Sequence, residues 1–237
     1  MSGKGPTAYD VAGHYDDAYF ADLAQRYRSR NRFARQRIAN VLSLLPALRD
    51  RVLVDVGTGM GTFTIEAGRR GARAIGIDMV HAAVRTARHV AAAEAATGAF
   101  FVQADGAQLP LPNASADVLL AADVTEHLDD DTLTRVLAEA RRALRPGGTL
   151  VLYTPSETHL FERLKDSGIL LKQDPSHIGV RTADELAAAV ERAGFALERV
   201  AFLPSHLPVW NRLERAFARR VPLLRRRIGI VARKRPA

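Results

Sequence analysis

The sequence Val52-Leu-Val-Asp-Val-Gly-Thr-Gly-Met-Gly61 joins a short apolar run to a turn with three glycines. A second apolar run, Arg73-Ala-Ile-Gly-Ile-Asp78, follows and ends on an acid. Glycine adopts positive φ angles and lets a ligand approach the backbone closely, so the pattern predicts a strand (51–56), a tight turn, a helix (61–70) and a second strand (73–78). A carboxylate at the tip of the second strand can accept hydrogen bonds from a ribose diol.

The spacing of the glycines argues against a dinucleotide ligand. A dinucleotide fingerprint needs glycines at 57, 59 and 62, but residue 62 is Thr. Asp55 also precedes the turn, where its charge would repel a pyrophosphate. We therefore expect a nucleoside that carries a cationic or amino-acid group, and not NAD.

The stretch from Asp55 to Gly61, with Asp78 after it, resembles the class I S-adenosylmethionine-dependent methyltransferases. Five further segments resemble the same family in the same order: Gln103-Ala-Asp105-Gly-Ala, Leu109-Pro-Leu-Pro112, Asp117-Val-Leu-Leu, Glu126-His127-Leu and Leu144-Arg-Pro-Gly-Gly148. The resemblance is continuous from about residue 50 to 155 and is greatest to small-molecule members, such as those of ubiquinone biosynthesis and secondary metabolism.

The resemblance implies S-adenosyl-L-methionine as cofactor, S-adenosyl-L-homocysteine as product, and a set of binding residues. These are Asp55, Gly57, Thr58, Gly59, Gly61, Asp78, Met79, Asp105, Gly106, Ala107, Asp123 and Tyr15. Asp55 and the glycine loop would hold the methionine end, Asp78 the ribose and Asp105 the adenine amino group. The alternative for Asp78 and Asp105 is that each caps the helix or loop that follows. Tyr15 would either cover the cofactor from a lid or attach the first helix to the core.

Three side chains are candidates for catalysis: His127, Glu126 and His177. An imidazole has a suitable pKa to deprotonate a phenol, enol or hydroxyl. The alternatives are a framework role for His127, an arginine pair for Glu126 and an ordinary loop position for His177. The sequence shows no His-x-x-x-His and no clustered carboxylates, so we expect no metal.

Alternating strands and helices predict a Rossmann-like α/β fold, with helices on both faces of a seven-stranded, mostly parallel sheet. The remaining strands are expected at 99–103, 116–122, 148–153, 195–202 and 228–233, and the remaining helices at 80–96, 131–144 and 183–193. The resemblance implies that the last strand is antiparallel and lies between the fifth and the sixth. Extra N-terminal helices would form a cap or lid over 1–46. The methyltransferase domain would span 47–237, with a helical insertion at about 208–224.

Composition limits the class of protein. The 237 residues are 47% hydrophobic and 25% charged and include no cysteine, which excludes disulfides and thiol catalysis. No apolar run is long enough to cross a membrane and the N-terminus lacks a signal-like apolar region, so we expect a cytoplasmic protein.

Positive charge is concentrated in the last part of the chain. Ten Arg or Lys and one Glu lie between Arg212 and Arg235, a net +9 in a chain whose total is +8. The basic amphipathic segment 210–227 would be an ordinary solvated or core-packed helix, or would contact an anionic membrane.

We expect a methyltransferase that acts on a small molecule, most readily by O-methylation of a quinone-like, lipid-linked, sugar or secondary-metabolite acceptor. An RNA methyltransferase that uses the basic segment is the first alternative, although the Asn/Asp-Pro-Pro-Tyr box that stacks a flipped base is missing after residue 122. A non-catalytic cofactor-binding module is the second. Oligomeric state is left open.

Overall fold

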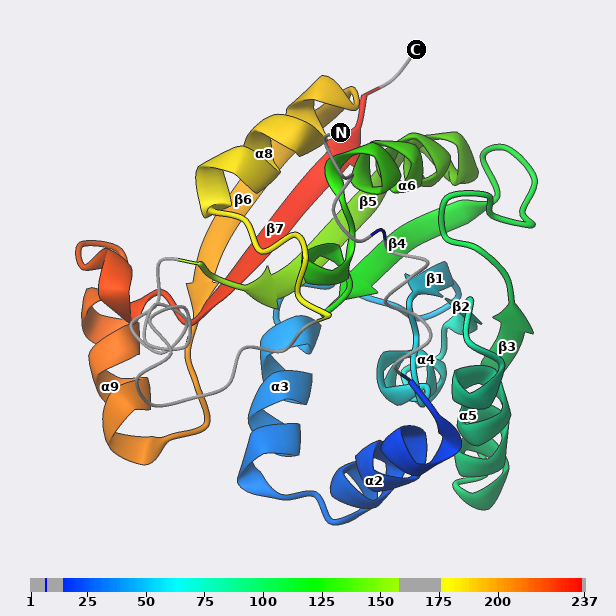
Figure 1. Cartoon of the computed structure of the whole chain (residues 1–237). Coiled ribbons are helices and arrows are strands. Elements are labelled where there is room, and N and C mark those ends of the chain that lie inside the picture. Colours follow the sequence, from blue (N-terminus) through cyan, green and yellow to red (C-terminus); the bar gives the residue numbers. More distant parts are fainter. Residues whose placement is uncertain (1–6, 8–14, 158–175, 236–237) are drawn as a thin grey trace, which may run out of the picture.

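The computed structural model describes residues 7, 15–157 and 176–235 and contains a seven-stranded sheet of order β3-β2-β1-β4-β5-β7-β6 (Figure 1). The strands are β1 (Val52–Val56), β2 (Arg73–Asp78), β3 (Ala99–Gln103), β4 (Ala116–Ala122), β5 (Leu144–Pro155), β6 (Phe195–Leu203) and β7 (Arg227–Lys234). The first five strands pair in parallel, whereas β7 is antiparallel to both β5 and β6. The predicted fold class and the position of the last strand are confirmed.

Helices cover both faces of the sheet (Figure 1). They are α2 (Asp17–Arg28), α3 (Arg32–Leu42), α4 (Thr62–Gly68), α5 (His81–Ala93), α6 (Asp130–Ala143), α8 (Ala183–Arg192) and α9 (Pro208–Phe217), with short 3₁₀ turns η1 (Thr125–His127) and η2 (Pro222–Leu224). Helices α6 and α8 pack on one face, and α3, α4 and α5 on the other. Successive strand residues alternate between the two: Leu119 packs with α6, whereas Leu120 packs on the opposite face.

Local signals in the sequence set the starts of several helices. Asp16, Asn31 and Asp129 each cap a helix by accepting a hydrogen bond from a backbone N–H in the first turn. Helix α8 begins with a capping box, in which Thr182 and Glu185 each accept from the other's backbone N–H.

The start of β5 differs from the prediction. Strand β5 begins at Leu144 and not at residue 148, because Leu144 pairs with Ala116 ahead of a register irregularity in β4. The region predicted as one or two N-terminal helices forms α2 and α3, and the insertion predicted at 208–224 forms α9 and η2. The first residues of the predicted lid, 1–6 and 8–14, lie outside the described residues. In the part of the chain that the structure describes, no helix combines the length and apolar character needed to cross a bilayer.

Candidate active site

A cavity of about 380 Å³ lies at the carboxyl ends of β1, β2 and β4. Twelve predicted site residues line it: Tyr15, Gly57, Thr58, Gly59, Asp78, Met79, Asp105, Gly106, Asp123, Glu126, His127 and His177. Open α/β sheets bind ligands at this edge, and the volume is in the range of small-molecule sites. Three predicted residues, Asp55, Gly61 and Ala107, are not part of its lining.

The glycine loop after β1 requires glycine at more than one position. Gly57 has φ +68°, and a Cβ there would lie 2.3 Å from a methyl carbon of Val124. Gly59 has φ +55°, and the nearest atom to its Cβ position is a ring carbon of Phe20 at 3.9 Å. The loop therefore packs tightly against the residue after Asp123 at one glycine and presents open backbone to the cavity at the next.

Asp78 joins the tip of β2 to the glycine loop. Its Oδ2 accepts a hydrogen bond from Gly59 N at 2.8 Å, and its Oδ1 accepts from Val80 N at 3.0 Å. Burial raises the pKa of this carboxyl, and the backbone N–H donors oppose the rise. Each oxygen keeps a lone pair for a further donor, so the predicted ribose contact and the alternative capping role are compatible.

Asp55 lies beneath the loop and does not line the cavity. It is 1% exposed, and its Oδ2 accepts from the hydroxyls of Thr58 and Thr64, both at 2.8 Å. Burial raises the pKa of Asp55 to about 6, against these two hydrogen bonds. The structure thus shows Asp55 holding the loop through Thr58, while direct contact with the ligand stays a prediction.

The remaining predicted cofactor-binding residues near the glycine loop come from the loops after β1 and β3. Gly61 caps α4 with φ +88°, and a Cβ there would lie 2.8 Å from the ring of Phe101. Asp105 Oδ1 accepts from Ala107 N at 2.8 Å, so Ala107 orients the carboxylate that lines the cavity. A Cβ on Gly106 would lie 2.7 Å from Val56 Cγ1, which explains the glycine beside it.

Asp123, directly after β4, is held between two arginines. Its backbone has φ +57°, a conformation that Asp tolerates better than most residues. Arg37 Nε donates to Oδ2 at 2.6 Å, and Arg227 Nη1 donates to Oδ1 at 2.7 Å. Burial favours the neutral acid, but Arg227 and Arg37 outweigh it and lower the pKa of Asp123. The three residues come from α3, the loop after β4, and β7, and they form a charged junction in the cavity wall.

The segment 176–181 is fixed onto the turn η1 that follows Asp123. Gly179 N donates to Glu126 O at 2.8 Å, and a Cβ on Gly179 would lie 2.1 Å from Leu128 O. The guanidinium of Arg181 donates to Thr125 O and to Leu128 O, both at 2.9 Å. This packing places His177 beside His127, although 50 positions separate them in the sequence.

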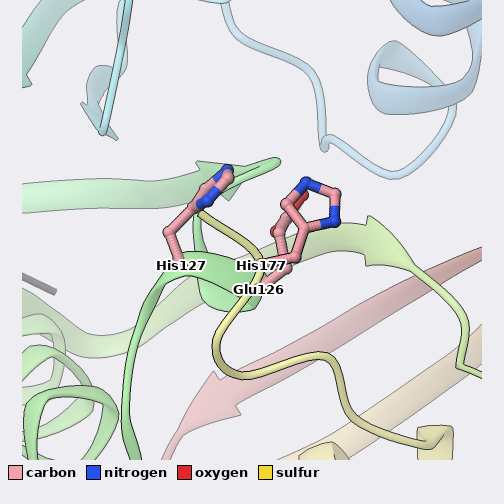
Figure 2. A group of neighbouring side chains, drawn as sticks. All are labelled: Glu126, His127 and His177. Atoms are coloured by element: carbon pink, nitrogen blue, oxygen red, sulfur yellow. The ribbon is translucent and has the colours of Figure 1, made fainter. Parts of the chain in front are cut away.

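The three predicted catalytic side chains converge (Figure 2). The ligating atoms of Glu126, His127 and His177 lie within 4.8 Å of one another, and the two imidazole rings meet edge to face with centroids 4.9 Å apart. No local pattern in the sequence indicates this convergence, because His177 is distant in sequence, and the expected absence of a metal stays a prediction. Two imidazoles and a carboxylate could hold a divalent cation or accept a proton.

A hydrogen bond to the backbone indicates the tautomer of His127, and burial shifts the pKa of Glu126. His127 Nδ1 lies 2.9 Å from Ser176 O, and a carbonyl only accepts, so Nδ1 carries the hydrogen and Nε2 of the neutral ring is the acceptor. Glu126 is 2% exposed and accepts from Thr154 Oγ1 at 2.9 Å. Burial, reinforced by the Asp123 carboxylate, raises the pKa of Glu126 to about 7, although His127 opposes the rise.

Tyr15 lies against His127. Its hydroxyl donates to Ser176 Oγ at 2.8 Å, and the Tyr15 and His127 rings meet edge to face. The aromatic residue beside the glycine loop is Phe20, whose ring is buried and lines the cavity. Sequence reasoning missed Phe20, although its helical spacing with Leu23 and Tyr27 marked it as an inward-facing position of α2.

Sequence reasoning also missed the cavity residues of α3 and β7. Phe33 and Arg37 from α3, and Arg226 and Arg227 at the start of β7, line the cavity. Arg226 and Arg227 belong to the basic stretch from Arg212 to Arg235, and nothing local in the sequence distinguishes the arginines that face inward. His206 does not line the cavity and instead meets Phe33 edge to face.

The strand order and the position of the cavity define a protein of the Rossmann-like α/β class. Residues 54–152 match the family model described as a methyltransferase domain. A probable S-adenosylmethionine-dependent methyltransferase of Mycolicibacterium smegmatis is 38% identical over 92 residues, which are 39% of this chain and 33% of that protein. Over residues 54–152 the chain is therefore similar to the S-adenosylmethionine-dependent methyltransferases. It spans about a third of the length of the curated relatives it matches.

Solved structures share the fold across nearly the whole chain. An S-adenosylmethionine-dependent methyltransferase from Aquifex aeolicus has a TM-score of 0.68 at 16% identity and covers 93% of this chain and 99% of its own. The [4+2]-cyclase SpnF has a TM-score of 0.72 at 18% identity and covers 98% of both chains. At such identities the likeness shows the fold alone, and the fold hosts more than one kind of reaction.

Proposed function

We propose that this protein transfers the methyl group of S-adenosylmethionine to an oxygen atom of a small acceptor molecule. The observation that carries the proposal is the division of one cavity between two groups of residues. The glycine loop, Asp78 and Asp105 lie at the ends of β1, β2 and β3, and the group of Glu126, His127 and His177 lines the same cavity. A nucleoside donor and a protonated acceptor could therefore occupy it together.

The residues of the loop end fit the cofactor. The open backbone at Gly59 and the carboxylate of Asp78 suit the methionine and ribose portions, and Asp105 suits the adenine. Among the described residues neither Asp55 nor Asp78 forms an ion pair, so their negative charge is left to attract a cation. When bound, S-adenosylmethionine supplies a methyl group that its positive sulfur already makes electrophilic.

The chain's own residues then have to position the acceptor and remove its proton. As the acceptor oxygen bonds to the methyl carbon, the carbon–sulfur bond breaks and the hydroxyl proton must leave. His127 Nε2 is the available acceptor, because Nδ1 is committed to Ser176 O. Glu126, with a pKa of about 7, is the second candidate. Packing of α2 and α3 over the cavity limits access of water.

The acceptor classes we propose are quinone-like, lipid-linked, sugar or secondary-metabolite compounds. Aromatic and apolar side chains in the lining, including Phe20, Leu23 and Phe33, support an acceptor with an apolar part. The RNA alternative has weaker support, because the exposed arginines of α9 share their surface with exposed apolar side chains.

Cofactor binding is tested by calorimetry with S-adenosylhomocysteine. Asp78→Ala removes the predicted ribose acceptor and the acceptor for Gly59 N, and we expect affinity to fall by about tenfold or more. Asp184→Ala, on an exposed residue of α8, is the matched control and should bind as the parent does. Unchanged affinity in Asp78→Ala would remove the assigned site.

Methyl transfer is tested by a screen of the four acceptor classes with labelled cofactor. Once an acceptor is found, His127→Asn should lower kcat by about 10² or more with S-adenosylhomocysteine affinity unchanged, because the amide still donates toward Ser176 O but lacks Nε2. A chelator that abolishes turnover of the parent would instead assign a divalent cation to the group. An unaltered rate and pH profile in His127→Asn would exclude this histidine as the base.

A further inference from the structure

Helix α9 has its polar side toward the protein and its apolar side toward solvent, the reverse of an ordinary surface helix. Its inward side is polar: Glu214 is buried and accepts from Ser205 N, and Asn211 donates to Gln36 Oε1 at 3.1 Å. Its outward side is apolar, with Val209 72%, Leu213 41% and Phe217 48% exposed. Surface helices normally bury the apolar stripe, so some apolar environment is expected to cover this one.

The apolar stripe continues beyond the helix and has a basic border. Two further large apolar residues are exposed: Val221, directly before η2, and Leu223, within η2. Four exposed arginines accompany the stripe: Arg212, Arg215, Arg219 and Arg220. Within the described ranges, none of these four pairs with a carboxylate. We call the surface formed by residues 208–225 the α9 face.

The composition of the α9 face selects its partner. Residues 208–225 include five arginines and one glutamate, a net charge of +4, so two copies of this face would repel each other. Valine, leucine and phenylalanine next to arginines match the boundary between headgroups and acyl chains of an anionic bilayer, where the guanidinium groups reach phosphates while the apolar tips enter the membrane.

We propose that the α9 face docks this protein onto the surface of an anionic lipid bilayer. Figure 1 shows α9 at one end of the molecule, beyond the edge strand β6 and far from the opposite edge strand β3. Arg226 and Arg227, which directly follow the face, line the cavity. Docking therefore brings the cavity close to the membrane and favours an acceptor with an apolar tail, an extension that rests on the proposed function.

The test is co-sedimentation of the full chain with sucrose-loaded vesicles of phosphatidylcholine alone or mixed with phosphatidylglycerol. We expect binding only to the mixed vesicles, and weaker binding as salt is raised. The double variant Leu213→Ser with Phe217→Ser removes apolar contacts without changing charge. Its affinity for the mixed vesicles should fall by about tenfold or more. Arg212→Gln with Arg219→Gln should bind more weakly and lose most of the salt dependence.

A matched control is Phe100→Ser, since Phe100 is an exposed aromatic residue on β3 at the other edge of the sheet. It should bind vesicles as the parent does. Thermal unfolding and S-adenosylhomocysteine affinity establish that each variant is folded, and they separate failure of docking from failure of the proposed function. Equal binding by parent and apolar variant, no binding to anionic vesicles at low salt, or concentration-dependent self-association lost in the apolar variant would each overturn the proposal.

Discussion

The two ends of the cavity hold their carboxylates in different ways. At the glycine loop, Asp78 accepts from the N–H groups of Gly59 and Val80, and Asp55 accepts from two threonine hydroxyls. At the other end, Asp123 lies between the guanidinium groups of Arg37 and Arg227. Neutral donors orient a carboxylate and leave its charge in place, whereas arginines orient the carboxylate and also neutralise its charge.

The difference separates two tasks within one small volume. In the described part of the chain, the loop end has no arginine paired to its carboxylates, so its negative charge would attract a cationic ligand. Burial without such a partner raises the pKa values of Asp55 and Asp78. The other end pairs Asp123 with two arginines, in the part of the cavity that also holds Glu126 and His127. Changes at one end should therefore leave the other intact, and the following variants test this independence.

The largest effect is expected at the contact between the two ends, Gly57. Gly57→Ala adds a Cβ 2.3 Å from Val124 at a positive φ, and we expect a loss of about 3 kcal/mol or more in the free energy of unfolding, together with loss of S-adenosylhomocysteine binding. Gly147→Ala has a similar φ, +73°, but open space around it, so its cost should be about 1 kcal/mol. Equal losses in urea titrations would show that the clash does not matter.

Arg227→Met tests the arginine-held end. It leaves Asp123 with Arg37 alone, and we expect about 2 kcal/mol of destabilisation at pH 7 with cofactor-product affinity unchanged. Because the two arginines lower the pKa of Asp123, its stabilising contribution is present above the carboxyl's usual pKa and is lost as pH falls through the lowered value. The difference between variant and parent should shrink in acid. Arg233→Met, which breaks an exposed pair with Glu198, should cost at most about 0.5 kcal/mol.

Glu126→Gln tests the buried acid of the same end. With a pKa raised to about 7, Glu126 binds its proton more tightly in the folded state than in the unfolded one, so stability falls as pH rises from about 4.5 to 7 and stays reduced above. The amide keeps an acceptor for Thr154 and never ionises. We expect the variant to gain about 1–2 kcal/mol over the parent at pH 8 and little at pH 4.5. A constant offset between the two pH values would contradict the raised pKa.

Thr64→Val tests the hydroxyl-held end and should have the smallest effect. It removes one hydrogen bond that keeps the Asp55 carboxylate ionised, which should cost about 1 kcal/mol and raise the pKa of Asp55 further above 6. Affinity for S-adenosylhomocysteine should then fall more at pH 6 than at pH 8, as calorimetry would show. Thr134→Val, at an exposed hydroxyl of α6, is the control. A pH-independent loss would indicate a packing effect alone.

The loop end could be predicted from the sequence because its parts are local. Gly57, Gly59 and Asp78 lie in consecutive elements, and positive φ angles confine such positions largely to glycine. Even there, the burial of Asp55 under two threonines could not be predicted, because it depends on the turn of α4.

The other end could be predicted only in part. Glu126 and His127 could be predicted because the segment Glu126-His127-Leu resembles a family motif, but their contact with His177 depends on Gly179 packing against Leu128. Arg37 and Arg227 come from α3 and β7, and no periodicity distinguishes them from the many arginines that face solvent. Side chains that meet across long separations are set by tertiary packing, which a single sequence does not display.

The antiparallel strand β7 has a consequence for how the protein forms. It is synthesised after the other six strands, yet it lies between β5 and β6 and supplies Arg227 to Asp123. The parallel strands β1 to β5 can pair beforehand, whereas β6 has no neighbour until β7 arrives. We therefore expect the glycine-loop end of the cavity to form first and the end that contains Asp123 and Arg227 to form last. During refolding, cofactor binding should then return before methyl transfer does.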